Sequence, residues 1–114
     1  MNRFALAKLQ DGETLVDYKE GGNSMAPLIY SRQPVTISPV KVDLVEPGDI
    51  VVARVHGRVV CHLVLVTESN RVQIGNNHGR VNGWTGREKI YGIVTHVEDR
   101  ARPNSLEKVK LQVD

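Results

Sequence analysis

The stretch GDIVVARVHGRVVCHLVLV, residues 48–66, decides the fold class of this 114-residue chain. Two Val-rich runs, 50–55 and 58–66, flank His56-Gly57, and the glycine supplies the positive φ that a tight hairpin turn needs. Alternation in the second run gives one face Val59, Cys61, Leu63 and Leu65, and the other Val60, His62, Val64 and Val66. We therefore predict a central β-hairpin whose second strand is buried on both faces. A buried histidine in it needs a polar partner.

Short β-rich runs separated by Gly, Pro and Asn fill the rest of the chain, without long helical periodicity. They predict further strands at 14–18, 34–38, 71–74 and 90–97, and the alternating VKLQV, 109–113, predicts an edge strand. The expected fold is mostly β with little helix. It forms one domain over residues 1–114, with a core at about 13–98 and a charged tail at 99–114.

Composition excludes several classes of protein. The net charge is +2, and the Lys and Arg residues are scattered among few aromatics, which disfavours nucleic-acid binding. No apolar run approaches the length of a membrane-spanning helix or a secretory signal. A single cysteine allows no intrachain disulfide and fits a reducing compartment. We expect a cytoplasmic protein that binds neither nucleic acid nor membrane.

The stretch GGNSMAPLIY, residues 21–30, places a serine after two glycines. Gly21 and Gly22 let the chain bend sharply, so that Ser24 stands at the end of the bend. The hydroxyl has two interpretations. It is a nucleophile, or it caps a helical turn over MAPLIY with Pro27 in its first positions, and the isolated motif favours the cap. We predict that Met25 fills the core.

Three stretches in order resemble the peptidase superfamily of LexA-type repressors, mutagenesis-protein processing enzymes and signal peptidases. GNSMAPLI (22–29) is similar to its Gly-x-Ser-Met-x-Pro box, 47–66 to its second box, and EKIYGIVTHV (88–97) to its closing strand. The resemblance covers roughly residues 20–97, and the ordered combination is more specific than any single box. It implies a LexA/signal-peptidase-like β-rich complex fold and serine endopeptidase activity without a cofactor.

Specific residues carry this implied chemistry. LexA-type members have a lysine base on the returning strand, and His62 falls at that position, as in the Ser-His signal peptidases of eukaryotes and archaea. The resemblance implies that Ser24 attacks a peptide carbonyl, that His62 moves the proton, and that the backbone N–H groups of Ser24 and Asn23 hold the oxyanion. A neutral histidine, with an ordinary pKa of about 6.5, suits this role near neutral pH.

The residue expected to orient the histidine, here called the third position, departs from the superfamily pattern. Asn82 falls where the Ser-His signal peptidases have an aspartate, and IGNN (74–77) follows their Gly-Asp-Asn-Asn segment loosely. An asparagine orients an imidazole but brings no negative charge to the imidazolium. Asn76, Asn77 or a water are the alternatives for this position. Asn82 therefore favours weak activity or a second function, a catalytically silent domain that binds a peptide or protein.

The histidines and the cysteine are also weighed as metal ligands. Their positions lack the paired spacing of a zinc site, so no metal is expected: His56, Cys61, His62, His78 and His96. Cys61 and His62 point to opposite faces of a strand, which argues against a Cys-His dyad and makes Cys61 a buried apolar residue. We interpret His78 as a solvated loop residue. The less favoured alternative is that it serves as a second general base. Trp84 is interpreted as a partly buried anchor in preference to a groove wall.

The expected partner is a protein or peptide substrate. The short segment before Ser24 holds no Ala-Gly bond of the kind that the repressors cut in themselves, so cleavage of another protein is favoured over self-cleavage. Compact members of this kind suit a bacterium or a bacteriophage. A homodimer is left open.

Overall fold

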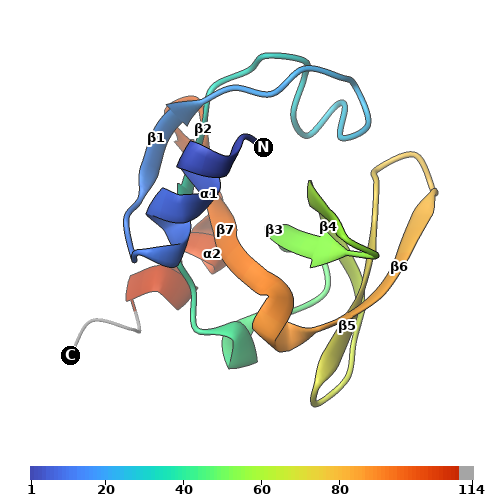
Figure 1. Cartoon of the computed structure of the whole chain (residues 1–114). Coiled ribbons are helices and arrows are strands. Elements are labelled where there is room, and N and C mark those ends of the chain that lie inside the picture. Colours follow the sequence, from blue (N-terminus) through green and yellow to red (C-terminus); the bar gives the residue numbers. More distant parts are fainter. Residues whose placement is uncertain (111–114) are drawn as a thin grey trace.

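One antiparallel sheet organises the chain in a computed structural model that describes residues 1–110 (Figure 1). Its eight strands are β1 (Leu15–Tyr18), β2 (Val35–Ser38), β3 (Ile50–Val55), β4 (Arg58–Thr67), β5 (Arg71–Gly75), β6 (Val81–Gly86), β7 (Ile90–Val97) and β8 (Arg100–Ala101). The order across the sheet is β1-β2-β7-β3-β4-β5-β6, and β8 pairs with β7. The helices are α1 (Arg3–Gln10) and α2 (Pro103–Lys110), with short 3-10 turns at Val42–Leu44 and Arg87–Lys89. The mostly β fold class is confirmed.

The predicted hairpin is confirmed and lies at the centre of the sheet. β3 and β4 pair in register from Ile50–Leu63 to Val55–Arg58, across a turn in which His56 has φ 49° and Gly57 φ 78°. Two consecutive positive φ angles match the turn type that right-twisted hairpins prefer. β3 also pairs with β7, so its amides are bonded on both sides.

The two hydrophobic cores lie on opposite faces of β3. Ile50 and Val52 belong to one cluster, which also holds Met25 and α1, whereas Val51, Ala53 and Val55 belong to the other. Alternation along the strand produces this division. β3 is therefore the strand that is buried on both faces.

The prediction that β4 is buried on both faces is wrong. Val64 is 1% exposed, but Cys61 and His62 are only half-buried, and Val66 is 43% exposed. On one face of β4, Val60 and His62 line an open depression, and on the other face Cys61 lines a pocket, so neither face is fully covered. This exposure gives His62 access to a ligand.

The sequence predicted neither α1, β6 nor β8, and it predicted a strand at the end of α2. Asn2 caps α1 by accepting a hydrogen bond from the Ala5 N–H at 2.9 Å, and α1 buries Ala5 and Leu9. In the tail, α2 replaces the predicted edge strand, because Val109 and Lys110 end this helix. Residues 111–113 of that prediction lie outside the described residues.

A buried ion pair joins α2 to the start of β3. Lys108 Nζ lies 2.9 and 2.8 Å from the two carboxylate oxygens of Asp49, and 3.0 Å from Glu46 Oε1. The Lys108 and Asp49 side chains are 8% and 6% exposed. Burial alone would lower the pKa of Lys108, but hydrogen bonds and charge attraction from Asp49 and Glu46 outweigh it and raise that pKa.

Candidate active site

The Ser24 loop is a run of turns, and the cap interpretation is wrong. Gly22 adopts φ 98°, and the following turns are closed by Ala26 N–H to Asn23 O and Ile29 N–H to Met25 O, both at 3.1 Å. No helix forms over the MAPLIY segment, and its Ala26–Pro27 peptide bond is cis. The Ser24 hydroxyl is bonded instead to His62, with 3.1 Å between Oγ and Nε2.

His62 lies between Ser24 and Asn82. On β4 it pairs opposite Val51 of β3, and its Nδ1 lies 2.6 Å from Asn82 Oδ1 on β6. An amide oxygen only accepts hydrogen bonds, so Nδ1 carries the ring proton. The Nε2 lone pair then faces Ser24 Oγ and can accept the hydroxyl proton. The structure thus brings together the three residues that the sequence singled out.

Gly83 allows β6 to approach the hairpin tip. It has φ 137°, and a Cβ added to it would lie 2.5 Å from His56 Nε2. A side chain at this position would therefore meet the His56 ring and strain the backbone next to Asn82. Sequence reasoning missed this packing, because the contact joins the β3–β4 turn to a strand that no periodicity relates to it.

A polar loop after β5 supports the Ser24 loop from outside. The Asn77 backbone N–H donates to Ser24 O, and its side-chain amide donates to Ala26 O, both at 3.0 Å. His78 is exposed, but its Nε2 lies 3.0 Å from Asn23 O, so it contacts the site loop where a purely solvated residue was predicted. Asn76 Oδ1 closes the loop by accepting from the His78 and Arg80 N–H groups at 2.8 and 3.0 Å. Asn76 and Asn77 are supports, and Asn82 holds the third position.

The predicted oxyanion donors are the backbone N–H groups of Asn23 and Ser24. Within the described part of the chain, neither N–H donates a hydrogen bond. Both therefore remain free to bind a developing oxyanion beside the serine. Met25, the next residue, is 5% exposed and belongs to the core, as predicted.

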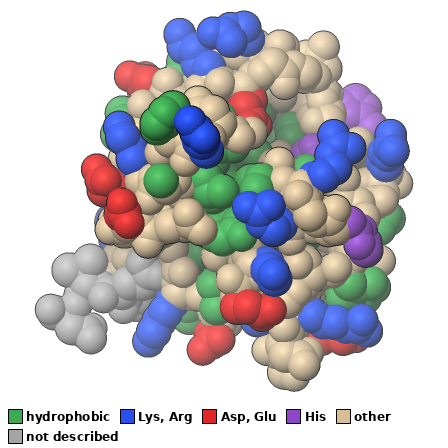
Figure 2. All heavy atoms as spheres, in the orientation of Figure 1, with side chains coloured by type: hydrophobic (Ala, Val, Ile, Leu, Met, Phe, Trp, Pro, Cys, Tyr) green, Lys and Arg blue, Asp and Glu red, His purple; other side chains and the backbone are tan. Residues whose placement is uncertain are grey.

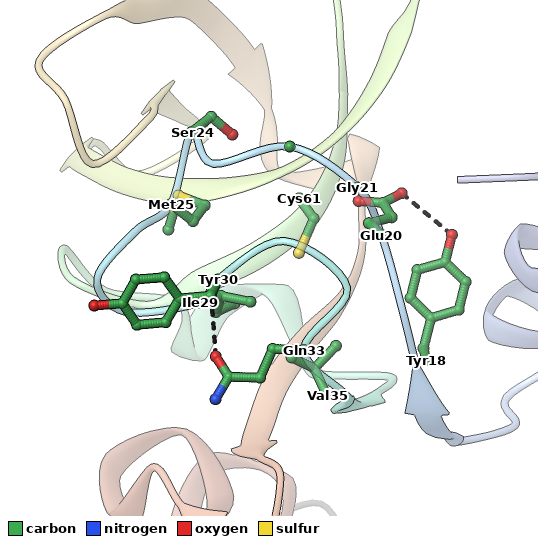
Figure 3. Close-up of a pocket in the computed structure, with 11 residues that line it drawn as sticks. Tyr18, Glu20, Gly21, Ser24, Met25, Ile29, Tyr30, Gln33, Val35 and Cys61 are labelled. Carbon is green, nitrogen blue, oxygen red and sulfur yellow. Dashed lines mark hydrogen bonds between the residues drawn. The ribbon is translucent and has the colours of Figure 1, made fainter.

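A pocket begins at Ser24 and runs toward β1 and β2 (Figure 3). We call it the apolar pocket after Met25, Ile29 and Val35 in its wall, and the polar side chains of Glu20 and Gln33 line it as well. It has about 420 Å³ of empty space, part of it open to solvent, and is lined by Tyr18, Glu20, Gly21, Gly22, Ser24, Met25, Ile29, Tyr30, Gln33, Val35 and Cys61. The Cys61 sulfur points into it, and removal from water raises the pKa of this thiol to about 12. Burial and the neighbouring Glu20 raise the pKa of Tyr18 to about 12 as well. Glu20 also pairs with the Met1 amino group at 2.8 Å.

A second depression, here called the basic groove, begins at Ser24 and runs the other way, over β4 and β6. It has about 910 Å³ of empty space, again partly open, and is lined by Ser24, Val55, His56, Arg58, Val60, His62, Asn76, Arg80, Val81 and Asn82. On the side where Figure 1 places β4 and β6, Figure 2 shows Lys and Arg side chains gathered next to histidines. The serine thus stands between an apolar pocket and a basic groove.

Two further features of the surface complete the description. The Arg71 guanidinium stacks on the half-buried Trp84 ring at 4.1 Å, and Trp84 lines neither the pocket nor the groove. Among residues 1–110, no three His, Cys, Asp or Glu side chains gather in a way that could hold a metal ion. No helix in the same range is long and apolar enough to cross a membrane.

Comparison of the chain with protein-family models, curated proteins and solved structures finds no match.

Proposed function

We propose that the chain is a cytoplasmic serine endopeptidase with the fold and chemistry of the LexA and signal-peptidase superfamily. The observation that carries this proposal is the Ser24–His62–Asn82 hydrogen-bond chain, with distances of 3.1 and 2.6 Å. A nucleophile bonded to a base, which is itself oriented by a third group, is the arrangement that activates a serine. The three residues come from a loop and two strands that are far apart in sequence.

The proposed reaction is an acyl transfer to Ser24 followed by hydrolysis. As Oγ forms a bond to the peptide carbonyl carbon, its proton passes to His62 Nε2, and the C=O π pair moves to the oxygen near the Asn23 and Ser24 N–H groups. Collapse of this intermediate breaks the C–N bond, and the leaving amine takes the proton from Nε2. Water then attacks the acyl ester, giving its proton to Nε2, which returns it to Oγ as the acid product leaves.

A fluorophosphonate probe tests the proposal, because it reacts with activated serines. We expect mass spectrometry to show one probe adduct on the wild-type chain, located at Ser24, and none on Ser24→Ala. An unlabelled wild-type chain, with circular dichroism showing that it is folded, would contradict the proposal.

The second candidate function is a silent domain of the same kind that binds a peptide. Two observations favour it: Asn82 lacks the charge that stabilises an imidazolium, and β1 and β6 end the sheet with unpaired edges in the described structure. Binding of a peptide at micromolar affinity with no probe adduct would establish it over the peptidase.

A further inference from the structure

The basic groove carries cationic side chains that no acidic residue neutralises. The Arg58 and Arg80 side chains belong to exposed residues that line it, and no Asp or Glu does. In the described part of the chain, neither guanidinium forms an ion pair or a hydrogen bond. Arg71, by contrast, pairs with Glu68 at 2.6 Å, and the Arg87 guanidinium donates to Val42 O at 2.7 Å. The groove thus presents unused positive charge beside the dyad.

The chemistry of His62 fixes which part of a substrate meets this groove. In the proposed reaction His62 gives its proton to the leaving amine, so the residues after the cleaved bond must pass over His62. His62 lines the basic groove and does not line the apolar pocket. The residue before the cleaved bond then faces the apolar pocket, on the other side of Ser24. The two depressions receive the two halves of the substrate.

We propose that this enzyme selects substrates with acidic side chains in the segment after the cleaved bond, bound by Arg58 and Arg80. The inference rests on the proposed function, because the direction of the substrate follows from the role of His62. Carboxylates pair with guanidinium groups through charge-assisted hydrogen bonds, and Arg suits them through its planar fork of donors. Valine side chains at positions 60 and 81 of the groove would pack against the substrate backbone between the charges.

Peptide binding to a Ser24→Ala variant tests the inference without requiring catalysis. The probes are fluorescein-labelled peptides with one shared apolar first half and a second half that is acidic, amidated to Asn and Gln, or lysine-rich. In fluorescence anisotropy we expect the acidic peptide to bind about tenfold more tightly than the amide peptide, since two exposed ion pairs are worth roughly that much together. The lysine-rich peptide should bind most weakly. Added salt should remove the preference, because these charges are exposed.

Matched charge variants test whether the preference for acidic peptides depends on Arg58 and Arg80. Arg58→Gln with Arg80→Gln should abolish it, whereas Lys8→Gln with Arg100→Gln, which removes the same charge from exposed positions that do not line the groove, should preserve it. Circular dichroism checks the fold of each variant. If the groove variant fails to fold, the peptide series and its salt dependence on Ser24→Ala alone still decide the outcome.

Each outcome has a defined meaning. Equal binding of acidic and amide peptides, or an acidic preference that survives the groove variant, would overturn the inference. So would a single-stranded oligonucleotide that binds the groove as tightly as the acidic peptide. Probe labelling of Ser24 without acidic preference would overturn the inference and leave the peptidase proposal standing. Acidic preference without labelling would overturn the peptidase and support the groove as an acidic-peptide site.

Discussion

The amide oxygen of Asn82 lies 2.6 Å from Nδ1 of His62, and this contact decides which ring nitrogen carries the proton. Because Nδ1 is the donor, Nε2 faces Ser24 as an acceptor. Asn82 therefore orients the His62 ring, but its neutral amide adds no charge to stabilise the imidazolium that would form during the proposed acyl transfer. The three residues are arranged as in a Ser-His-Asp triad, but Asn82 supplies no negative charge, so only Ser24 and His62 could take part in proton transfer.

Replacing Asn82 by aspartate should raise the labelling rate. A carboxylate at this position would stabilise the imidazolium, and orienting carboxylates are worth up to about 10⁴ in turnover, so we expect a gain of one to several powers of ten. The carboxylate also favours the charged ring, so the acid limb of the rate profile should move to higher pH. Rates measured from pH 5 to 9 test both effects. Asn82→Ala is the control and should lower the rate, and an Asn82→Asp profile identical to wild type would remove Asn82 from the third position.

Ser24→Ala should abolish labelling, and His62→Ala should lower it by about 10²–10⁴-fold, the range for loss of a general base. His96→Ala serves as the matched histidine control, since the His96 ring contacts Thr95 on β7, outside the site. A His62→Ala variant that labels at the wild-type rate would show that another group takes the proton.

Asn77→Ala should weaken the support of the nucleophile loop. The change removes the 3.0 Å hydrogen bond to Ala26 O but keeps the backbone bond to Ser24 O. We expect unfolding free energy to fall by about 1 kcal/mol and the labelling rate to fall about tenfold, since small misplacements of a nucleophile slow its reaction. Urea denaturation and labelling kinetics measure the two effects. A loss of stability with an unchanged rate would mean that the loop keeps Ser24 in place without this bond.

Lys108→Met should destabilise the fold by about 3–5 kcal/mol, because the buried Asp49 carboxylate loses its ion-pair partner. Adding Asp49→Asn should recover part of this loss, since both charges are then absent. The pKa of Lys108 is raised in the folded chain, so its stabilising contribution is complete below the ordinary lysine value of about 10.4 and is lost as pH rises through the folded value. Urea midpoints measured between pH 8 and 11.5 should fall in both chains, because the raised pKa values of Cys61 and Tyr18 also make the unfolded chain easier to ionise, and the fall should be larger in the wild type than in Lys108→Met.

The Cys61 thiol should be unreactive in the folded chain. Its pKa of about 12 keeps it protonated at neutral pH, and the thiolate is the reactive form. Iodoacetamide at pH 8 should modify it much more slowly than it modifies the urea-unfolded chain, by about 10²-fold or more. Cys61→Ala should keep the Ser24 labelling rate within a few-fold. Loss of labelling in a folded Cys61→Ala variant would assign the thiol a part in the chemistry.

The sequence predicts six strands that match β1 to β5 and β7, but it misses β6, β8 and both helices. The Val-rich runs that become β3, β4 and β7 carry their own signal, because β-branched residues in alternation fit a pleated surface. The sequence of β6 is VNGWTG, and its two glycines and asparagine have low β propensity. Pairing with β5 stabilises this strand in the folded chain. α2 is equally hidden, since its buried Lys108 finds its partner Asp49 only in the folded chain.

The candidate site, too, was predicted in part and missed in part. The grouping of Ser24, His62 and Asn82 came from the resemblance to the Ser-His signal peptidases, and it agrees with the chemistry, in which a nucleophile needs a base and a base needs an orienting group. The supports from Asn77 and His78 were missed, since they act through backbone carbonyls, which have no sequence signature. The half-exposed state of β4 was also missed, because an apolar alternation does not reveal how well each face is covered.

The position of β7 in the sheet has a consequence for the order of events during synthesis. Residues 90–97 insert between β2 and β3, and so join the segment with Ser24 to the meander with His62 and Asn82. Until the ribosome has released β7, the two halves of the dyad have no shared framework, and pairing of distant strands comes late in folding. We therefore expect a nascent chain stalled before β7 to give no probe adduct, and one stalled well beyond it to give the full adduct. Late pairing of β7 would therefore delay the proposed hydrolysis until synthesis of the central sheet is complete.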